Sequence, residues 1–462
     1  MIGETFSLTT RIARPAAEVF AWHERAGALA RLCPPWERVE IVAATGGVRD
    51  GARVTVRNKF GPLWLNWRME HRDYVAGRQF RDVQLSGPFA AWEHLHRVEP
   101  DEAGACRLTD EISYRLPGGA LGRAVAGGFV RRELQRLFHW RHAVTKADVE
   151  LAAQYQRMRA RRVLIAGASG LVGRTLVAFL QTQGHSVVRL VRREATGEGE
   201  VAWNPATGEL DPGAIEGVDA IVNLSGENVG AGRWTAARRE AILRSRVDAT
   251  RTLVVALQKL RRKPEVFVSA SAVGFYGEGG EEVLDEKSPI GLGFLPGICL
   301  AWETHAEGAA RAGVRTVLMR FGVVLTPAGG ALAKMLPVFR AGLGGRIGTE
   351  HQWMSWISAD DAVGALHHAI VEPRCRGPMN VVAPEAVTNR TFAATLGRVL
   401  RRPAIFPVPA VALRALFGEM ADGTLLASTR VHPRRLVGTG YVYRQPTLEG
   451  ALRHTLGEGN NA

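Results

Sequence analysis

The sequence predicts two unlike folded parts: an antiparallel sheet with a long helix, followed by a doubly wound α/β sheet. Three observations support this organisation. Over residues 1–150, apolar and polar residues alternate with a period of two, as in half-buried strands. From residue 161 onward, short apolar runs alternate with helical stretches, which is typical of a parallel sheet. The first of these runs leads into three glycines and an amphipathic helix, the pattern of a turn that binds phosphate.

The first part starts with a strand-like segment and a short helix over 15–20, with proline in its first turn. Two later segments alternate, and the residues expected to face inward are Leu63, Leu65, Trp67 and Met69 in the first and Leu108, Ile112, Tyr114 and Leu116 in the second. A glycine-rich stretch, 117–128, is expected to precede a long helix. The apolar side of that helix carries Val130, Leu134, Leu137 and Phe138.

Several polar residues of the first part fall at unusual positions. Asp110 lies in the inward register of its strand, and we interpret it as an edge position or a register break, with a polar ligand contact as the alternative. His94 and His96 share a strand face, and His139 and His142 share a helical face. Either pair suits a metal, but the sequence indicates no third ligand, so we interpret them as core or solvated histidines and predict no metal site.

The order of elements over residues 3–148 resembles the START-like, helix-grip superfamily, which includes polyketide cyclases and lipid-transfer proteins. This resemblance implies an α+β domain over 1–150 with a cavity for an apolar ligand. The aromatic residues that would line it are Trp64, Trp67, Trp92, Tyr114 and Phe129; the alternative is that they fill a core. Residues 151–160 are expected to form a helical linker.

The glycine motif is Gly167-Ala-Ser-Gly170-Leu-Val-Gly173, directly after an apolar run over 162–166. A strand, a tight turn and a helix in this order place backbone N–H groups and a positive helix end at one point, which suits a pyrophosphate. The first glycine permits the turn, the second lets a phosphate approach, and the third lets the helix pack closely. The expected cofactor-binding residues of this loop are Gly167, Ser169, Gly170, Leu171, Val172 and Gly173.

The parallel strands are expected at 162–166, 186–191, 219–224, 265–270, 315–320 and 378–382. Arg192 and Arg193 follow the second strand, where folds that prefer NAD carry an acidic residue. The planar guanidinium pairs with phosphate oxygens in a bidentate way, so the sequence predicts NADP(H) rather than NAD. The alternative is an ordinary exposed basic turn.

The next two strands end in small polar residues. Leu224, Ser225 and Gly226 follow the third strand and are expected to flank the cofactor, because small residues let it pass close to the backbone. The fourth strand ends in Ser269-Ala-Ser271, with Tyr276 shortly after. We place Ser269 beside the cofactor and take Ser271 and Tyr276 as the candidate catalytic residues.

These motifs closely resemble the extended short-chain dehydrogenase/reductase superfamily over about 162–456, and within it the epimerase-family proteins described as sugar-nucleotide epimerases or cell-division-inhibitor-like. They include Gly232-Arg-Trp234, Ser245-Arg246, Gln352-Trp-Met-Ser-Trp-Ile357 and Gly418-Glu-Met420. The resemblance implies a Rossmann dinucleotide-binding domain over 161–380 and a small domain on the substrate side over 381–462.

The superfamily works through a Tyr-x-x-x-Lys pair, and this chain departs from it. The expected tyrosine position falls at Leu295 and the lysine position at Cys299. Positioned acid–base catalysis typically contributes about 10²–10⁴ in rate, so this absence matters. Three replacements are open: Tyr276 as the proton donor, Cys299 as a thiol acid, or a substrate such as a conjugated acceptor that needs little proton assistance.

Composition narrows the function classes. The chain has 462 residues and a net charge of +14, with basic residues scattered rather than clustered, which favours anionic ligands over nucleic acid. Four distant cysteines predict neither disulfides nor zinc and fit the cytoplasm, and no apolar run is long enough to span a membrane. The sequence thus predicts an NADP(H)-dependent oxidoreductase or epimerase with an unknown small-molecule substrate. The alternatives are a non-catalytic NADP(H)-binding or sensing protein coupled to apolar-ligand binding, and lipid transfer by the first domain.

Overall fold

The computed structural model describes residues 3–155 and 158–459. The chain divides into two compact units. The N-terminal unit contains residues 1–158 with the short segments 178–184 and 457–462, and the C-terminal unit contains 159–177 and 185–456. Within the described ranges, no helix combines the length and the apolar character needed to cross a membrane.

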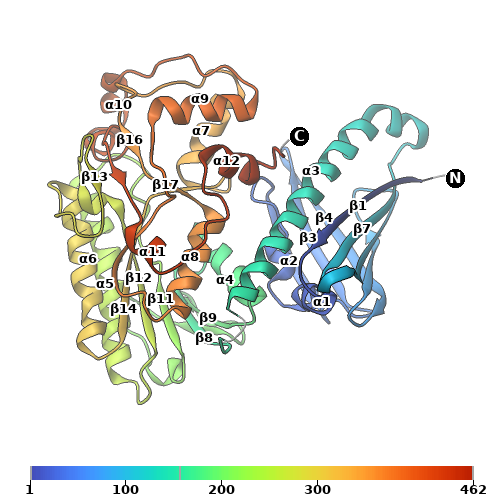
Figure 1. Cartoon of the computed structure of the whole chain (residues 1–462), viewed down its shortest axis with the longest axis horizontal. Helices are drawn as coiled ribbons and strands as arrows, with labels where there is room; N and C mark the ends of the chain where they lie inside the picture. The colour runs from blue at the N-terminus through green and yellow to red at the C-terminus, as the bar shows by residue number, and fades with distance from the viewer. Residues whose placement is uncertain (1–2, 156–157, 460–462) are drawn as a thin grey trace. The chain divides into compact units, whose positions relative to one another are not determined.

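The N-terminal unit is an antiparallel sheet of seven strands in the order β1-β7-β6-β5-β4-β3-β2. The strands are β1 (Glu4–Ile12), β2 (Val39–Thr45), β3 (Arg53–Phe60), β4 (Leu63–Val75), β5 (Gln79–Ser86), β6 (Ala91–Pro100) and β7 (Cys106–Arg115). The helices are α1 (Ala16–Glu24), α2 (Ala28–Arg31) and the long α3 (Gly119–Gln154). Figure 1 shows α3 running along the sheet, where it packs mainly against β1 and β7.

The inward register predicted for β7 is confirmed, with Leu108, Ile112 and Tyr114 all buried. The prediction for β4 is only half right: Leu63 is 63% exposed, whereas Trp67 is half-buried. The helix α3 packs mainly against β1 and β7, at the other end of the strand order, so the start of β4 has little to bury its apolar face.

The glycine-rich stretch does not precede the long helix but belongs to it, because α3 begins at Gly119. Gly118 and Gly119 have φ of +77° and +58°, so the glycines turn the chain into the helix. Once a long helix exists, each added residue gains a hydrogen bond, which carries the helical conformation through residues of low propensity.

The C-terminal unit is an α/β fold with a parallel sheet in the order β10-β9-β8-β11-β12-β14-β18. The six predicted strands are confirmed within two residues at each end: β8 (Arg162–Ala166), β9 (Ser186–Val191), β11 (Ala220–Asn223), β12 (Val266–Ala272), β14 (Arg315–Phe321) and β18 (Gly377–Val381). The short β10 (Glu200–Ala202) adds an edge strand. The main helices beside the sheet are α4 (Leu171–Thr182), α5 (Ala236–Lys259), α6 (Phe294–Arg311) and α8 (Ala359–Val371).

The last part of the chain forms α9 (Asn389–Leu400), α10 (Ala410–Phe417), α11 (Arg434–Gly438) and α12 (Leu448–Leu456). Of these, α9 and α12 build a core with α7 (Gly330–Arg340) around Leu332, Leu336, Phe392, Leu396 and Leu452. Two-stranded sheets join this part to the preceding chain: β13 (Val283–Leu284) with β20 (Arg430–Val431), and β16 (Trp353–Met354) with β19 (Val387–Thr388). A third pairs β15 (Val323–Leu325) with β17 (Trp356–Ser358). A domain boundary at residue 380 stays a prediction.

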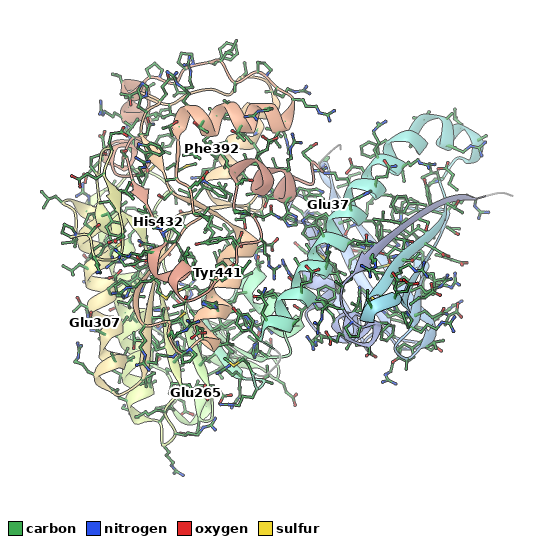
Figure 2. The ribbon with its side chains drawn as sticks, viewed as in Figure 1. Glu37, Glu265, Glu307, Phe392, His432 and Tyr441 are labelled. Carbon is green, nitrogen blue, oxygen red and sulfur yellow. The ribbon has the colours of Figure 1, made fainter. Side chains whose placement is uncertain are left out.

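The first turn of α8 is held by hydrogen bonds from a later segment of the chain, residues 441–445. The buried carboxylate of Asp361 accepts hydrogen bonds from the backbone N–H groups of Arg444 (2.8 Å) and Gln445 (3.0 Å). It also accepts from the hydroxyl groups of Ser358 (2.8 Å) and Tyr441 (3.0 Å), the latter labelled in Figure 2. Four donors therefore converge on one carboxylate.

Candidate functional site

The glycine turn after β8 has little room for side chains. Gly167 has φ of +82°, and a Cβ on Gly173 would lie 2.1 Å from the carbonyl oxygen of Gly167. The N–H of Gly170 donates to that same oxygen over 3.0 Å, which closes the turn. Only glycine fits at residue 173, so the start of α4 lies directly against the end of β8.

The turn lies where the strand order of the sheet reverses. Strand β8 pairs with β9 on one side and with β11 on the other, and ligands of open α/β sheets bind at the carboxyl ends of such strands. The loop after β11 is held beside the turn, because the N–H of Leu224 donates to Ala166 O over 2.9 Å. Asn223 fixes the loop by accepting from the N–H of Ser225 over 3.1 Å.

Gly226 continues this loop against a half-buried arginine. A Cβ on Gly226 would lie 3.0 Å from Cζ of Arg246, whose guanidinium donates to the backbone oxygens of Glu227 and Ile242 over 3.0 Å each. The guanidinium also lies 5.0 Å from the ring centre of Trp302. Burial lowers the pKa of Arg246. The loop residues Leu224, Ser225 and Gly226 are thus positioned as a set beside the glycine turn.

The two arginines after β9 differ in their contacts. Both are exposed, but Arg193 donates to the two carboxylate oxygens of Glu200 over 2.8 and 2.9 Å. Arg192 has no ion pair with any residue in the described ranges. Arg192 is therefore the guanidinium that is available to an incoming anion. Arg193 would first have to give up its pair with Glu200.

The two serines of β12 are both buried. Ser269 donates to the backbone oxygen of Ala270 over 3.2 Å. Ser271 donates to Oε1 of Glu303 over 2.6 Å. Glu303 belongs to α6 and forms a bidentate pair with Arg320 of β14, with both N–O distances 2.8 Å.

Tyr276 joins the same buried network. Its hydroxyl accepts from Nη1 of Arg320 over 3.0 Å and donates to Oδ1 of Asn380 over 2.8 Å. Burial raises its pKa, and the bonds from Arg320 only partly oppose this. Asn380 is held in turn by the backbone oxygen of His432, a residue labelled in Figure 2. The structure thus brings the two predicted catalytic residues, Ser271 and Tyr276, into one hydrogen-bonded network.

Sequence reasoning missed the residues that connect this network: Glu303, Arg320 and Asn380. The signal was present, because Arg320 interrupts an apolar run that forms a central strand, and Asn380 does the same in the strand beside it. A charged residue in a strand buried on both faces needs a buried partner. Nothing in the sequence indicated which acidic residue that partner would be.

The positions of the missing Tyr-x-x-x-Lys pair lie in α6 and serve packing. Cys299 is buried, and its Sγ lies 3.7 Å from Ala272 O. Burial and the nearby Glu303 raise the pKa of the Cys299 thiol to about 11. Leu295 lies against Gly274, because a Cβ added at Gly274 would be 3.3 Å from the Cβ of Leu295.

Leu295 also belongs to an apolar cluster between the loop after β11 and the last part of the chain. The cluster contains Trp234, Ile242, Ile298 and Met420, with Val229, Leu243, Phe294, Leu295 and Phe417 packed against it. The indole N–H of Trp234 donates to Val229 O over 2.9 Å, and its ring centre lies 4.9 Å from that of Phe294. This cluster forms an apolar wall near the carboxyl end of β12.

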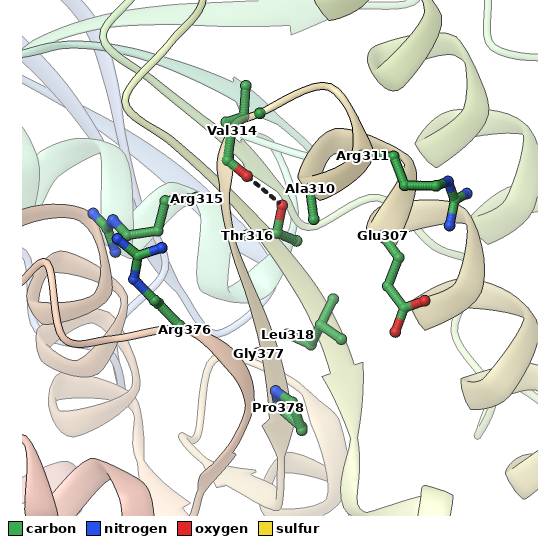
Figure 3. Close-up of a pocket in the computed structure, with 11 residues that line it drawn as sticks. Glu307, Ala310, Arg311, Val314, Arg315, Thr316, Leu318, Arg376, Gly377 and Pro378 are labelled. Carbon is green, nitrogen blue, oxygen red and sulfur yellow. Dashed lines mark hydrogen bonds between the residues drawn. The ribbon is translucent and has the colours of Figure 1, made fainter.

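A separate cavity of about 590 Å³ opens beside the amino ends of two strands, opposite to the ends that carry the glycine turn (Figure 3). It is lined by the first residues of β14 and β18 and by α6, including Arg311, Arg315, Thr316 and Arg376. The hydroxyl of Thr316 donates to Val314 O over 3.0 Å. Because this cavity lies at the amino ends of parallel strands, it is not part of the site at the glycine turn.

The N-terminal unit contains a second group of polar side chains, and here the interpretation of Asp110 is wrong. Asp110 lies in β7, between β1 and β6, so it occupies neither an edge nor a register break. Its carboxylate contacts three histidines: His94 (3.0 Å), His96 (2.8 Å) and His142 (2.7 Å). The carboxylate partner that the sequence did not indicate is therefore present.

A second carboxylate, Asp82 of β5, also contacts two of these histidines, His96 and His94. Its Oδ2 lies 3.2 Å from Nε2 of His96 and 3.7 Å from Nδ1 of His94. Burial lowers the pKa of His94 to about 4. Burial also acts to lower the pKa of His96, but Asp110 and Asp82 outweigh it and raise that pKa to about 9. Against the effect of burial, His71 and His96 hold the pKa of Asp82 below its usual range, and His96, His94 and His142 do the same for Asp110.

The aromatic residues proposed to line a cavity separate into two kinds. Trp92 and Tyr114 are buried in a core with Phe6, Ile112 and Phe138, and Trp67 packs against it. Trp64 and Phe129 are 39% and 58% exposed. The alternative of core filling therefore holds for Trp92 and Tyr114.

Three family models match the chain. Residues 4–139 match the family described as polyketide cyclase/dehydrase and lipid transport, and residues 163–382 match the NAD dependent epimerase/dehydratase family. Residues 408–455 match a domain of unknown function, DUF1731. The resemblances inferred for the two parts of the sequence are thereby confirmed.

Known proteins match either about two thirds of the chain or nearly all of it. The epimerase family protein Mb2239 of Mycobacterium bovis is 44% identical over 290 residues, which is 63% of this chain and 96% of the relative. The crystal structure of the nucleoside-diphosphate sugar epimerase from Corynebacterium glutamicum is 31% identical and covers 98% of this chain and 90% of its own, with a TM-score of 0.80.

A human relative matches about two thirds of the chain. The crystal structure of human epimerase family protein SDR39U1 (isoform 2) with NADPH is 36% identical over 64% of this chain and 98% of its own, with a TM-score of 0.58. The family model over residues 163–382 spans the glycine turn and the Ser271–Tyr276 network. The chain therefore belongs to the epimerase family of the short-chain dehydrogenase/reductase superfamily and carries an N-terminal domain of the polyketide cyclase and lipid-transport family.

Proposed function

We propose that this protein binds NADPH at the glycine turn and acts as an oxidoreductase or epimerase on a small molecule. The observation that carries the proposal is the turn itself, which lies at the reversal of the strand order and excludes a side chain at Gly173. The human relative crystallised with NADPH supports the same cofactor. The diffuse positive charge of the chain favours a phosphorylated ligand.

The residues present fit this dinucleotide. Backbone N–H groups of the loop and the first turn of α4 would hold the pyrophosphate, from Ser169, Gly170, Leu171 and Val172. Arg192 would pair with the 2′-phosphate, because it has no competing ion pair among the described residues. Ser225, Gly226 and Ser269 would lie along the cofactor. When bound, the nicotinamide supplies or accepts a hydride.

The chain's own contribution to chemistry would come from the Ser271–Tyr276 network. Ser271 gives its only proton to Glu303, so its oxygen is left to accept a hydrogen bond from a substrate hydroxyl. Arg320 places a positive charge beside Tyr276, which stabilises the phenolate that forms when this hydroxyl gives up its proton and so partly opposes the effect of burial on its pKa. The apolar wall of Trp234 and Leu295 would exclude water from the substrate side.

One observation favours a second function, a non-catalytic NADPH sensor. Leu295 replaces the catalytic tyrosine, and the hydroxyl of Tyr276 is engaged by Asn380 and Arg320. A proton donor has to release its bond to Asn380 before it reaches a substrate. In this alternative, NADPH binding is a signal that accompanies capture of an apolar ligand by the N-terminal domain.

Binding is tested by NADPH fluorescence titration of the full chain, with NADH for comparison. We expect Arg192→Ala to weaken NADPH binding and to leave NADH binding unchanged, because only NADPH carries the 2′-phosphate. The control Arg244→Ala removes an exposed arginine of α5 and should change neither. Equal loss for both nucleotides, or no loss, would contradict the assignment of Arg192.

Catalysis is tested by NADPH oxidation against quinones, enones and ketones, for the wild type and for Ser271→Ala and Tyr276→Phe. Turnover that falls in these variants while NADPH affinity is kept supports the enzyme. Tight NADPH binding without turnover of any compound supports the sensor.

The N-terminal domain is proposed to bind an apolar ligand, in keeping with its family. Mass spectrometry of the full chain purified from cells tests this. A bound apolar compound is expected, and its absence from repeated preparations would contradict the proposal. The four free cysteines support the reducing cytoplasm as the compartment.

A further inference from the structure

We propose that Asp82, His94 and His96 of the N-terminal unit form a binding site for one divalent first-row transition-metal ion of the zinc class. The sequence predicted no metal site, because the strand that carries the two histidines offers no third ligand. The sheet supplies that ligand from the neighbouring strand. The proposal does not depend on the function proposed for the C-terminal unit.

The register of the sheet assembles the site. His94 and His96 are two residues apart in β6, so their side chains point to the same face. Asp82 of β5 lies directly opposite His94, and Asp110 of β7 lies directly opposite His96. Side chains at such cross-strand positions come within contact distance without any bend of the backbone.

The distances match those of a shared ion. One ligand atom from each of Asp82, His94 and His96 lies within 4.8 Å of the others. The carboxylate atom Oδ2 of Asp82 is 3.2 Å from Nε2 of His96 and 3.7 Å from Nδ1 of His94. Bonds of about 2.0–2.2 Å in a tetrahedron separate neighbouring ligand atoms by roughly 3.4 Å. Both measured separations fall close to this value.

The other nitrogen of each histidine is already occupied. Nε2 of His94 and Nδ1 of His96 lie 3.0 and 2.8 Å from the same oxygen of Asp110. A carboxylate that takes these N–H groups leaves the other nitrogen of each ring directed at Asp82. Metal-binding histidines are characteristically oriented in this way by a carboxylate behind them.

Asp110 is itself held in place. Its second oxygen lies 2.7 Å from Nε2 of His142, and Nδ1 of His142 lies 2.7 Å from the hydroxyl of Thr10. This chain of contacts runs from β1 through α3 to β7, so three elements fix the support of the site. Asp110 and His142 are positioning residues in this arrangement, not ligands.

The charge of the cluster points the same way. Every ion-pair partner that the described residues give to Asp82 and Asp110 is a histidine: His71, His94, His96 and His142. Buried carboxylates ordinarily pair with arginine or lysine, or coordinate a metal. Two buried carboxylates beside these imidazoles provide the negative charge that a divalent cation needs.

The donor set selects the class of ion. Two imidazole nitrogens and one carboxylate suit Zn²⁺ or Fe²⁺, whereas Mg²⁺ and Ca²⁺ prefer oxygen ligands. Three protein ligands leave a position for water or for an oxygen of a bound ligand. The side chains of Asp82 and His96 are 14% and 11% exposed, whereas that of His94 is 3% exposed, so the open position faces the Asp82–His96 side.

The test uses the full chain, without a histidine tag, after dialysis against a chelator. Titration with Co²⁺, followed by its visible absorption, is expected to give one ion per chain without a thiolate charge-transfer band. Zn²⁺ should displace it. No saturable Co²⁺ spectrum and no zinc at one per chain by elemental analysis would overturn the proposal.

Variants locate the ion. His94→Gln and Asp82→Asn should abolish stoichiometric binding, and Asp110→Asn should weaken it by about 10–100-fold through loss of ligand orientation. His139→Gln removes an exposed histidine of α3 and should bind as the wild type does. Unchanged binding in His94→Gln would overturn the assignment. If a variant fails to fold, as judged by circular dichroism, the anomalous scattering of zinc in crystals of the wild type decides whether the ion lies between Asp82, His94 and His96.

Discussion

Glu303 and Arg320 form a fork-to-fork pair in the interior of the C-terminal unit, in which Nε and Nη2 of the guanidinium each donate to one carboxylate oxygen over 2.8 Å. Ser271 and Tyr276 bond to opposite ends of this pair. The pair is therefore the structural link between the two candidate catalytic hydroxyl groups.

Removal of one member should leave the other charge buried and unpaired. We expect Arg320→Ala to lower the free energy of unfolding of the C-terminal unit by about 3–5 kcal/mol. Arg244→Ala breaks an exposed pair with Glu240 and should change stability little. Urea unfolding followed by fluorescence measures both, and similar small losses for the two variants would contradict a buried pair.

The close approach at the glycine turn makes a second prediction. In Gly173→Ala the new methyl group would lie 2.1 Å from Gly167 O, so the turn has to open. We expect the Kd for NADPH to rise about tenfold or more, equivalent to at least ~1.4 kcal/mol. The same substitution at Gly128 of α3 meets only a flexible arginine end at 3.8 Å and should leave NADPH binding unchanged. Wild-type affinity in Gly173→Ala would contradict the placement of the cofactor at this turn.

The cysteines should be unreactive in the folded chain. Burial raises the pKa of Cys33, Cys106, Cys299 and Cys375 from about 9 to about 11 each. At pH 8 the native protein should thus react slowly with a thiol reagent and rapidly after denaturation. Fast labelling of native Cys299, located by mass spectrometry, would instead support its role as a thiol acid.

The same shifts set a dependence on pH. Because the folded thiols ionise near 11 and the unfolded thiols near 9, the unfolded state releases protons first as the pH rises. The stabilising contribution of the buried thiols is complete below about pH 9 and is lost as the pH rises towards 11. Denaturant midpoints measured from pH 8 to 11 should fall, and the fall should be smaller in Cys299→Ala.

The carboxylate of Asp361 allows a prediction about stability, because it accepts hydrogen bonds from residues 441–445. Asp361→Asn would turn an NH₂ group towards two of the four donors, which should cost about 2 kcal/mol or more. Asp422→Asn, on an exposed carboxylate paired with Arg414, is the matched control. Thermal unfolding of both variants measures the difference, and equal melting temperatures would contradict the role of Asp361.

The parallel strands were predictable because their physical cause is local. The runs 162–166 and 186–191 are mostly apolar, with Arg162, Ser186 and Arg189 as the exceptions, and are bounded by polar turns, so their place as strands can be read directly. The glycine turn was predictable for the same reason, since its spacing fixes its shape. The start of β4 was not, because exposure of Leu63 depends on which part of the sheet α3 covers.

The partners within the polar networks could not be predicted from the sequence. Arg320 required a partner, but Glu303 comes from a helix 17 residues away and competes with every other acid in the chain. Asp110 and Asp82 belong to strands on either side of β6, and their meeting with His96 depends on the register of two pairings. Alternation gives the face of a side chain and not its neighbour across the sheet.

The four donors on Asp361 have a practical consequence for anyone who shortens this protein. The family match to the nucleotide-binding part stops at residue 382, yet α8 of that part begins at a carboxylate whose donors include Tyr441, Arg444 and Gln445. A fragment cut at the family boundary would leave this carboxylate buried and without three of its four donors. Residues 441–445 thus supply the hydrogen bonds that the first turn of α8 needs, although they follow that helix by some 80 positions. A stable fragment therefore has to extend beyond them.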